Sequence, residues 1–141
     1  MHTYELSLSA VAGAPRATVS LELPATWTAE VAADGAPTFS APGLSGLVFG
    51  LSATPTDDVE PAARIAQAFK WQYEDGEGVT REELADGRLW AVRVEGRITH
   101  ARVFVPVDGG VVMAVAMLRE VTPAQLAEIK AAFSSLRAGK A

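Results

Sequence analysis

The chain has 141 residues, no cysteine and a net charge of −5 at pH 7. A chain of this length forms about one domain, which buries roughly two thirds of the surface that its unfolded state exposes. Its composition, 49% hydrophobic and 21% charged, excludes the polar, highly charged class of disordered chains. The missing cysteines exclude disulfides and thiolate sites, and the acidic balance argues against nucleic acid and anionic membranes as partners.

The sequence contains no pattern typical of export or of membrane insertion. Residues Met1–Leu6 lack the basic and apolar regions of a secretory signal peptide. The longest uninterrupted apolar run, Val111–Leu118, is far too short to cross a bilayer. We therefore expect a cytoplasmic protein without membrane insertion, folded as a single domain over residues 1–141.

The first third of the chain predicts short strands separated by turns. Tyr4, Leu6 and Leu8 alternate with polar residues, which is the period of a half-buried strand. A second alternation over 18–23 ends at Pro24, which has no amide hydrogen to donate. Turn residues separate three further predicted strands, over 27–32, 38–41 and 46–53.

A helix is predicted from about Asp58 to about Tyr73, because residues 56–58 offer N-cap oxygens. Trp71 lies about 200° around this helix from Phe69, so we expect it to point away from the packed face. Such an indole either acts as a binding anchor or folds down onto the neighbouring strand. The predicted buried stripe consists of Ala62, Ile65, Ala66, Phe69 and Tyr73.

The second half of the chain predicts an antiparallel meander followed by a helix. Glycine-containing turns at 86–87, 95–96 and 108–110 separate four runs rich in β-branched and aromatic residues, beginning at Thr80. The last run, 111–118, is apolar on both alternating faces, so we expect it to be covered on both sides.

The C-terminal helix has a complete start signal, because Thr122 and Gln125 form a capping box around Pro123. Its predicted buried stripe consists of Leu126, Ile129, Phe133 and Leu136. Together these elements predict an α+β fold in which a twisted antiparallel sheet is flanked by helices on both faces.

The segment Leu23-Pro24-Ala25-Thr26-Trp27 and the order of the predicted elements together resemble the PsbP-like superfamily. That group includes PsbP photosystem subunits, Mog-type Ran-binding factors, bacterial lipoproteins and type VI secretion effector chaperones. The resemblance implies an α/β/α sandwich and a non-enzymatic binding role. The chain lacks the lipobox cysteine and the plastid transit segment of two branches, and no functional residue carries over from the family.

The candidate catalytic and metal sites have simpler interpretations. Residues 43–47 resemble part of a nucleophile elbow but lack its final glycine, so we expect a plain turn. His100 has no orienting partner or nucleophile at a recognisable spacing, so we expect a structural residue. The acidic run 74–78 lacks the spacing of a calcium loop, so we expect a solvated loop. No metal or cofactor is predicted.

We therefore expect a non-enzymatic protein-binding module, an adaptor or a chaperone-like protein, whose partner can be a second copy of the chain. The acidic loop would then steer basic partners toward the aromatic anchor. Two alternatives stay open, namely a small-ligand or lipid-binding pocket between sheet and helix, and a hydrolase-like enzyme that uses His100. The predicted partner-binding residues are Trp71, Tyr73, Glu74, Asp75 and Glu77.

Overall fold

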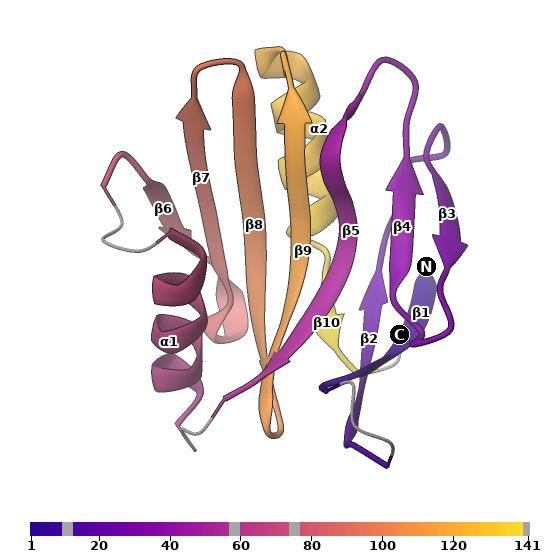
Figure 1. The fold of residues 1–141 in the computed structure, drawn as a ribbon, viewed down its shortest axis with the longest axis vertical. Helices are drawn as coiled ribbons and strands as arrows, with labels where there is room; N and C mark the ends of the chain where they lie inside the picture. Colours follow the sequence, from indigo (N-terminus) through magenta and orange to yellow (C-terminus); the bar gives the residue numbers. More distant parts are fainter. Residues whose placement is uncertain (10–12, 57–59, 74–76, 140–141) are drawn as a thin grey trace.

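A computed structural model describes residues 1–9, 13–56, 60–73 and 77–139. Its described elements form a seven-stranded sheet, a three-stranded sheet and two α-helices (Figure 1). All the strand pairs in both sheets are antiparallel. The predicted α+β class with a large antiparallel sheet is therefore confirmed.

The large sheet has the strand order β3-β4-β5-β9-β8-β7-β6. Its last four strands in the sequence form the predicted meander, and Gly96 and Gly109 adopt positive φ angles of 59° and 82° in two of its turns. The strands are β3 (Thr28–Val31), β4 (Pro37–Ser40), β5 (Gly46–Pro55), β6 (Thr80–Glu83), β7 (Leu89–Glu95), β8 (Ile98–Val107) and β9 (Gly110–Arg119).

The small sheet has the order β1-β2-β10. The predicted alternation of its first strand is confirmed, because Tyr4, Leu6 and Leu8 are all buried. The two-residue strand β10 pairs with β2 and was not predicted from the sequence. The strands are β1 (His2–Ser7), β2 (Arg16–Leu21) and β10 (Arg137–Ala138).

Helix α2 (Pro123–Phe133) begins with the predicted capping box. The Thr122 hydroxyl accepts a hydrogen bond from the Gln125 amide at 3.2 Å, and the Gln125 side chain accepts one from the Thr122 amide at 2.8 Å. Beyond its other end, the guanidinium of Arg88 donates to the carbonyl oxygens of Ser134 and Leu136. Both ends of α2 are therefore held by side chains that satisfy free backbone groups.

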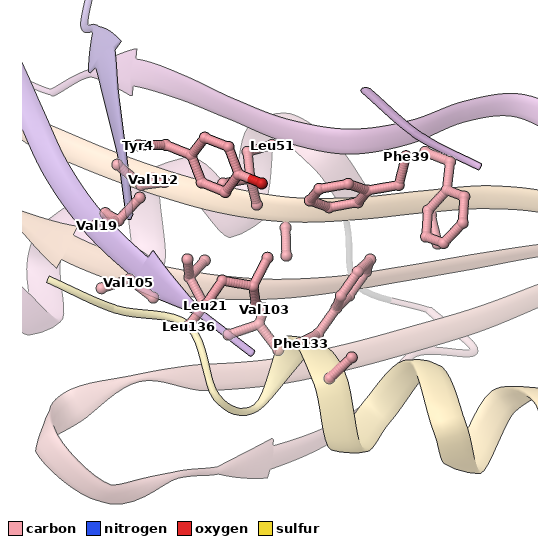
Figure 2. Close-up of a cluster of buried hydrophobic side chains, with 14 of the residues drawn as sticks. Tyr4, Val19, Leu21, Phe39, Leu51, Val103, Val105, Val112, Phe133 and Leu136 are labelled. Carbon is pink, nitrogen blue, oxygen red and sulfur yellow. The ribbon is translucent and has the colours of Figure 1, made fainter. Parts of the chain in front are cut away.

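Residues alternate across each strand, so the large sheet has a Val103 face and a Phe104 face. Val103 and Val105 belong to a cluster with α2 and the small sheet (Figure 2). Phe133 of this cluster lies with its ring centre 6.3 Å from that of Trp27 and 6.2 Å from that of Phe49. Most of the predicted α2 stripe is thus confirmed, since Ile129, Phe133 and Leu136 are buried and Leu126 is partly buried.

Helix α1 (Pro61–Tyr73) packs in a second cluster with Phe104 and with other residues of β7, β8 and β9. The buried residues of α1 are Ile65, Ala68, Phe69 and Tyr73, so Ala62 and Ala66 were wrongly placed in the predicted stripe. Ala68 is completely buried, whereas Ala62 and Ala66 are exposed on the side of the helix toward β6. The two exposed alanines instead line a cavity beside β6.

Strand β9 lies between β5 and β8 and supplies residues to both clusters. Ala114 and Ala116 belong to the α2 cluster, whereas Met113 and Val115 belong to the α1 cluster. The prediction that residues 111–118 are covered on both sides is confirmed for all but Met117, which is only partly buried.

Candidate interaction surface

Trp71 is the exposed aromatic residue of α1. Its side chain is 52% exposed, and Ile65 and Phe69 on the opposite part of the helix are buried. The prediction that Trp71 points away from the packed face is therefore confirmed. An exposed indole offers a large apolar area together with a hydrogen-bond donor, which suits it to binding a partner.

Tyr73 requires a correction, because it is completely buried. Its ring centre lies 5.2 Å from that of Phe69 and 4.6 Å from that of His100. The hydroxyl lies within hydrogen-bond distance of two backbone carbonyl oxygens, those of Ala91 at 3.4 Å and His100 at 3.3 Å. Tyr73 therefore belongs to the buried stripe and cannot contact a partner, because neighbouring side chains cover it.

The acidic part of the predicted site is only partly described. Glu77 is exposed, as expected for a solvated loop. Glu74 and Asp75 lie outside the described residues. Of the five predicted contact residues, the structure thus places Trp71 and Glu77 at the surface, and the steering role of the acidic loop stays a prediction.

The position of Trp71 around α1 decides which way it faces. Ala62, Ile65 and Ala66 line the cavity beside β6, and Trp71 lies about 180° from Ala62 around the helix. Arg64 lies only about 20° from Trp71 around the helix axis. Its guanidinium donates to the Val107 carbonyl oxygen at the end of β8, at 2.6 Å. The Trp71 side of α1 therefore points away from β6 and away from the sheet.

Part of the Phe104 face is uncovered beyond β9. Among the described residues, the buried members of the α1 cluster come from α1, β7, β8 and β9. Figure 1 shows no helix or strand in front of β4 and β5 on the side where α1 is drawn. We call this surface the open strip and define it by Thr38, Val48, Gly50, Ser52 and Met117, which share this face through the pairings of β4, β5 and β9. Thr38 and Val48 are exposed, Ser52 and Met117 are partly buried, and Gly50 is buried.

The open strip combines an apolar patch with a shallow hollow. Val48 is 46% exposed, and its neighbour Leu47 is 63% exposed because the register of β5 shifts between Gly46 and Val48. A hollow of about 200 Å³ lies beside Val48. Gly50 lines this hollow, and a Cβ atom there would lie 2.4 Å from the Pro37 carbonyl oxygen. The close approach of β4 to β5 therefore requires glycine.

A cluster of polar side chains borders α1 near its C-terminal end. The Nε atom of Arg102 donates to Nε2 of His100 at 2.7 Å. Burial, followed by the nearby charges of Arg102 and Arg93, lowers the pKa of His100 to about 4. Because Nε2 accepts a hydrogen bond, the proton of the neutral ring lies on Nδ1. His100 is therefore a neutral acceptor for a buried guanidinium at pH 7.

The hydrogen-bond partner of the His100 ring among the described residues is the guanidinium of Arg102. In the described parts of the chain, neither a carboxylate nor a hydroxyl group hydrogen-bonds to the ring of His100. The same residues contain no group of three or more histidine, aspartate and glutamate side chains placed to hold a metal ion. A turn at 42–43 leads through residues 44–45 into strand β5, which begins at Gly46, so the predicted turn is confirmed for the start of this segment and its last two residues belong to the strand.

A cavity of about 520 Å³ lies between α1 and β6. Ile65, Leu84 and Leu89 supply apolar walls, and Arg81 lines it with its guanidinium carbon 4.4 Å from the centre of the Phe69 ring. Arg88 borders the same cavity, but its guanidinium binds the carbonyl oxygens that follow α2. The cavity thus combines apolar walls with charged side chains of both signs, because Glu60 and Glu83 line it together with Arg81 and Arg88.

The comparisons with known proteins find nothing similar: no family model, no curated protein and no solved structure matches the chain. The resemblance to the PsbP-like superfamily therefore stays a prediction. Across the described ranges, neither α1 nor α2 is long and apolar enough to cross a membrane.

The open strip was missed in the sequence, although β5 carries a signal for it. Phe49 and Leu51 are large and apolar, whereas Gly50 and Ser52 between them are small or polar. This alternation is typical of a strand with one covered and one uncovered face. The alternation alone does not show which face is uncovered, because that depends on which strands and helices lie next to β5.

Proposed function

We propose that this protein is a non-enzymatic protein-binding module, an adaptor or a chaperone-like protein, which binds its partner through the open strip and the Trp71 side of α1. The observation that carries this proposal is the half-exposed indole of Trp71 on the outer side of α1, together with the exposed Val48 on the sheet face that α1 covers only in part. Apolar surface left in water costs about 25 cal/mol per Å², so a partner that covers both groups is stabilised.

The same proposal includes the arrangement of the layers. We propose an α/β/α sandwich of PsbP-like type over residues 1–141, with α2 and the small sheet on the Val103 face and α1 on the Phe104 face. The two separate clusters of buried side chains support this arrangement. In such a sandwich the sheet surface beyond α1 is the natural place for a partner, because no further layer of the chain covers it.

The composition supports a protein partner in the cytoplasm over nucleic acid. The net charge of −5 gives no reason to bind phosphate backbones. The mixture of apolar and small polar side chains on the open strip is typical of protein interfaces, which combine an apolar centre with a polar rim.

Capture experiments with matched variants test this proposal. We expect Trp71→Ala to lose the bound partner in affinity capture from the source cells, with a melting temperature close to that of the parent protein. The control is Val94→Ala, because Val94 is 63% exposed and lies on the other face of the sheet. Equal capture by all three proteins would overturn the proposal.

The cavity between α1 and β6 favours a second candidate function, binding of a small ligand or lipid. Its volume of about 520 Å³ suits a small molecule, and its lining combines apolar side chains with Arg81 and with the carboxylates of Glu60 and Glu83. A fluorescent fatty acid provides the test. We expect saturable binding that Ala66→Trp abolishes, because an indole at Ala66 would fill the cavity; binding unaffected by this change would exclude the site.

A further inference from the structure

We propose that the cavity between α1 and β6 binds a zwitterion with an apolar side chain, an α-amino acid of the phenylalanine or leucine type. This inference rests on the second candidate function, small-ligand binding, because it assigns a ligand class to the same cavity. The cavity lies on the opposite side of α1 from Trp71, so it is separate from the proposed protein-binding surface. Figure 1 shows α1 and β6 at the same edge of the molecule.

Part of the cavity wall is apolar. Ile65 of α1 and Leu89 of β7 are buried, and Leu84, which follows β6, is partly buried. On the α1 side, Ala62 and Ala66 line the cavity, and their small side chains leave the space in front of the apolar wall open. The volume of about 520 Å³ lies within the range of small-molecule sites. The walls therefore suit the apolar side chain of a ligand, whose removal from water is favourable.

Arg81 supplies a cation to the cavity. It pairs with Ala91, a member of the α1 cluster, so its side chain projects from the α1 face of β6. Its guanidinium carbon lies 4.4 Å from the centre of the Phe69 ring, which is itself buried. A guanidinium held over an aromatic ring directs its N–H groups outward in its own plane, where two of them can donate to one carboxylate. Arg81 is therefore placed to bind the carboxylate of a ligand.

Glu83 and Glu60 supply carboxylates to the same cavity. Glu83 lies two residues after Arg81 on the same face of β6, with Cα atoms about 7 Å apart. Glu60 directly precedes α1. At the other end of the helix, the hydroxyl of Tyr73 lies 3.4 Å from the carbonyl oxygen of Ala91, the residue paired with Arg81. Strand β6 therefore runs from Arg81 toward the start of α1, so both carboxylates lie on the same side of the guanidinium.

These charged groups do not neutralise one another. Among the described residues, Arg81, Glu83 and Glu60 form no ion pair. Glu82, between the two β6 residues, projects from the other face and binds Lys130 of α2 at 3.2 Å. The cavity thus holds a positive and a negative end that stay apart. A group that carries both charges on neighbouring atoms can join them through charge-assisted hydrogen bonds of about 2.8 Å each.

Charge distinguishes a zwitterion from an anion or a cation. A fatty acid can enter the cavity and bind Arg81, but it brings another negative charge beside Glu83 and Glu60. An amine satisfies a carboxylate and leaves Arg81 without a partner. A ligand with one charge of each sign satisfies both ends and adds no net charge to the cavity. An α-amino acid with an apolar side chain combines this pair of charges with a group for the apolar wall.

Isothermal titration calorimetry with L-phenylalanine at neutral pH tests the proposal. We expect saturable binding of one molecule per chain. The matched probes are phenylpropionate, which lacks the ammonium group, and phenylethylamine, which lacks the carboxylate. Each should bind at least about tenfold more weakly than L-phenylalanine, because charge-assisted hydrogen bonds at one end are lost. Equally tight binding of either probe would overturn the zwitterion.

Variants assign each charge of the ligand to its partner. Arg81→Gln should weaken L-phenylalanine about tenfold without weakening phenylethylamine, which does not use the guanidinium. Glu60→Gln together with Glu83→Gln should weaken L-phenylalanine without weakening phenylpropionate. The control is Glu82→Gln, because this side chain lies on the other face of β6 and should not affect any of the three ligands. Thermal unfolding shows whether each variant is folded, and a folded variant that weakens all three ligands equally would contradict the assignment.

The outcomes separate this inference from the small-ligand function. If the fluorescent fatty acid binds and L-phenylalanine does not, the function stands and the ligand class is wrong. If neither binds, both fail. Binding of L-phenylalanine that Ala66→Trp leaves unchanged places the ligand outside the cavity and overturns the inference. The protein-binding function is decided separately by the capture experiment with Trp71→Ala, because Trp71 lies on the other side of α1.

Discussion

The two faces of the large sheet differ in what covers them. On the Val103 face, α2 and the three-stranded sheet contribute buried side chains to a cluster with β4, β5, β7, β8 and β9, whereas Val94 near the end of β7 is 63% exposed. On the Phe104 face, α1 contributes Ile65, Ala68, Phe69 and Tyr73 over the β7 to β9 part, and Val48 on β5 remains 46% exposed. The first face thus has the larger cluster of buried side chains, whereas the second leaves apolar surface exposed at Val48.

The two faces differ in coverage because different numbers of helices and strands pack on them. The first face is covered by one helix and a second sheet, whose strands supply further apolar side chains such as Leu6, Val19 and Leu21. The second face has a single helix of 13 residues, which is too narrow for seven strands. A domain with this imbalance exposes sheet surface unless another chain covers it.

The largest expected effect is on the Val103 face. Phe133→Ala should lower the free energy of unfolding by about 3–5 kcal/mol, because a completely buried ring leaves a cavity among well-packed neighbours. Urea unfolding followed by circular dichroism measures the change. A loss under about 1 kcal/mol would show that α2 is not part of the core.

The corresponding change on the Phe104 face should cost less. Phe69 is 8% exposed, and Arg81 covers one side of its ring. Water and the arginine stem can partly fill the space that Phe69→Ala creates, so we expect a loss of about 2–3 kcal/mol. The same urea titration gives the comparison with Phe133→Ala, and a larger loss for Phe69→Ala would contradict the difference between the faces.

The buried histidine predicts a dependence of stability on pH. The pKa of His100 is lowered to about 4 in the folded chain from an ordinary value of about 6.5, because burial and the charges of Arg102 and Arg93 disfavour its protonated form. The unfolded chain therefore binds a proton at this residue at higher pH than the folded chain does. Its contribution is complete above about pH 6.5 and is lost as the pH falls to about 4.

We expect this loss to be on the order of 1–2 kcal/mol, since His100 is only partly buried and solvent screens its charge. Urea unfolding at several pH values between these limits measures it. His100→Gln keeps a hydrogen-bond acceptor for Arg102 but does not titrate. In this variant the part of the pH dependence of the unfolding free energy that comes from His100 should therefore disappear. If the unfolding free energy of the variant changes with pH as much as that of the parent chain, other titrating groups cause the dependence.

Local sequence patterns predicted the parts of the fold that depend on near neighbours. The capping box of Thr122 and Gln125 and the glycine turns of the meander each depend on a few consecutive residues. The alternation of Tyr4, Leu6 and Leu8 predicted a strand with one buried side. These features could be predicted because the sequence fixes backbone preference and side-chain period locally.

The remaining features depend on contacts between distant segments. Strand β10 exists because Arg137 and Ala138 lie beside β2, more than a hundred residues earlier. The burial of Tyr73 depends on β8, which supplies His100 and Phe104 next to its ring. For the candidate site, the exposure of Trp71 could be derived from the helix period, but the open strip beside it could not, because the order of the strands determines it.

The smallest expected effect on stability is that of Trp71→Ala. Its indole is 52% exposed and lies outside both clusters of buried side chains. We expect the free energy of unfolding of the monomer to change by less than about 0.5 kcal/mol, as for other surface substitutions. Urea unfolding measures this, and the same variant should lose partner capture. If Trp71→Ala unfolds the chain, the indole supports the core, and the binding surface must be sought elsewhere on the sheet.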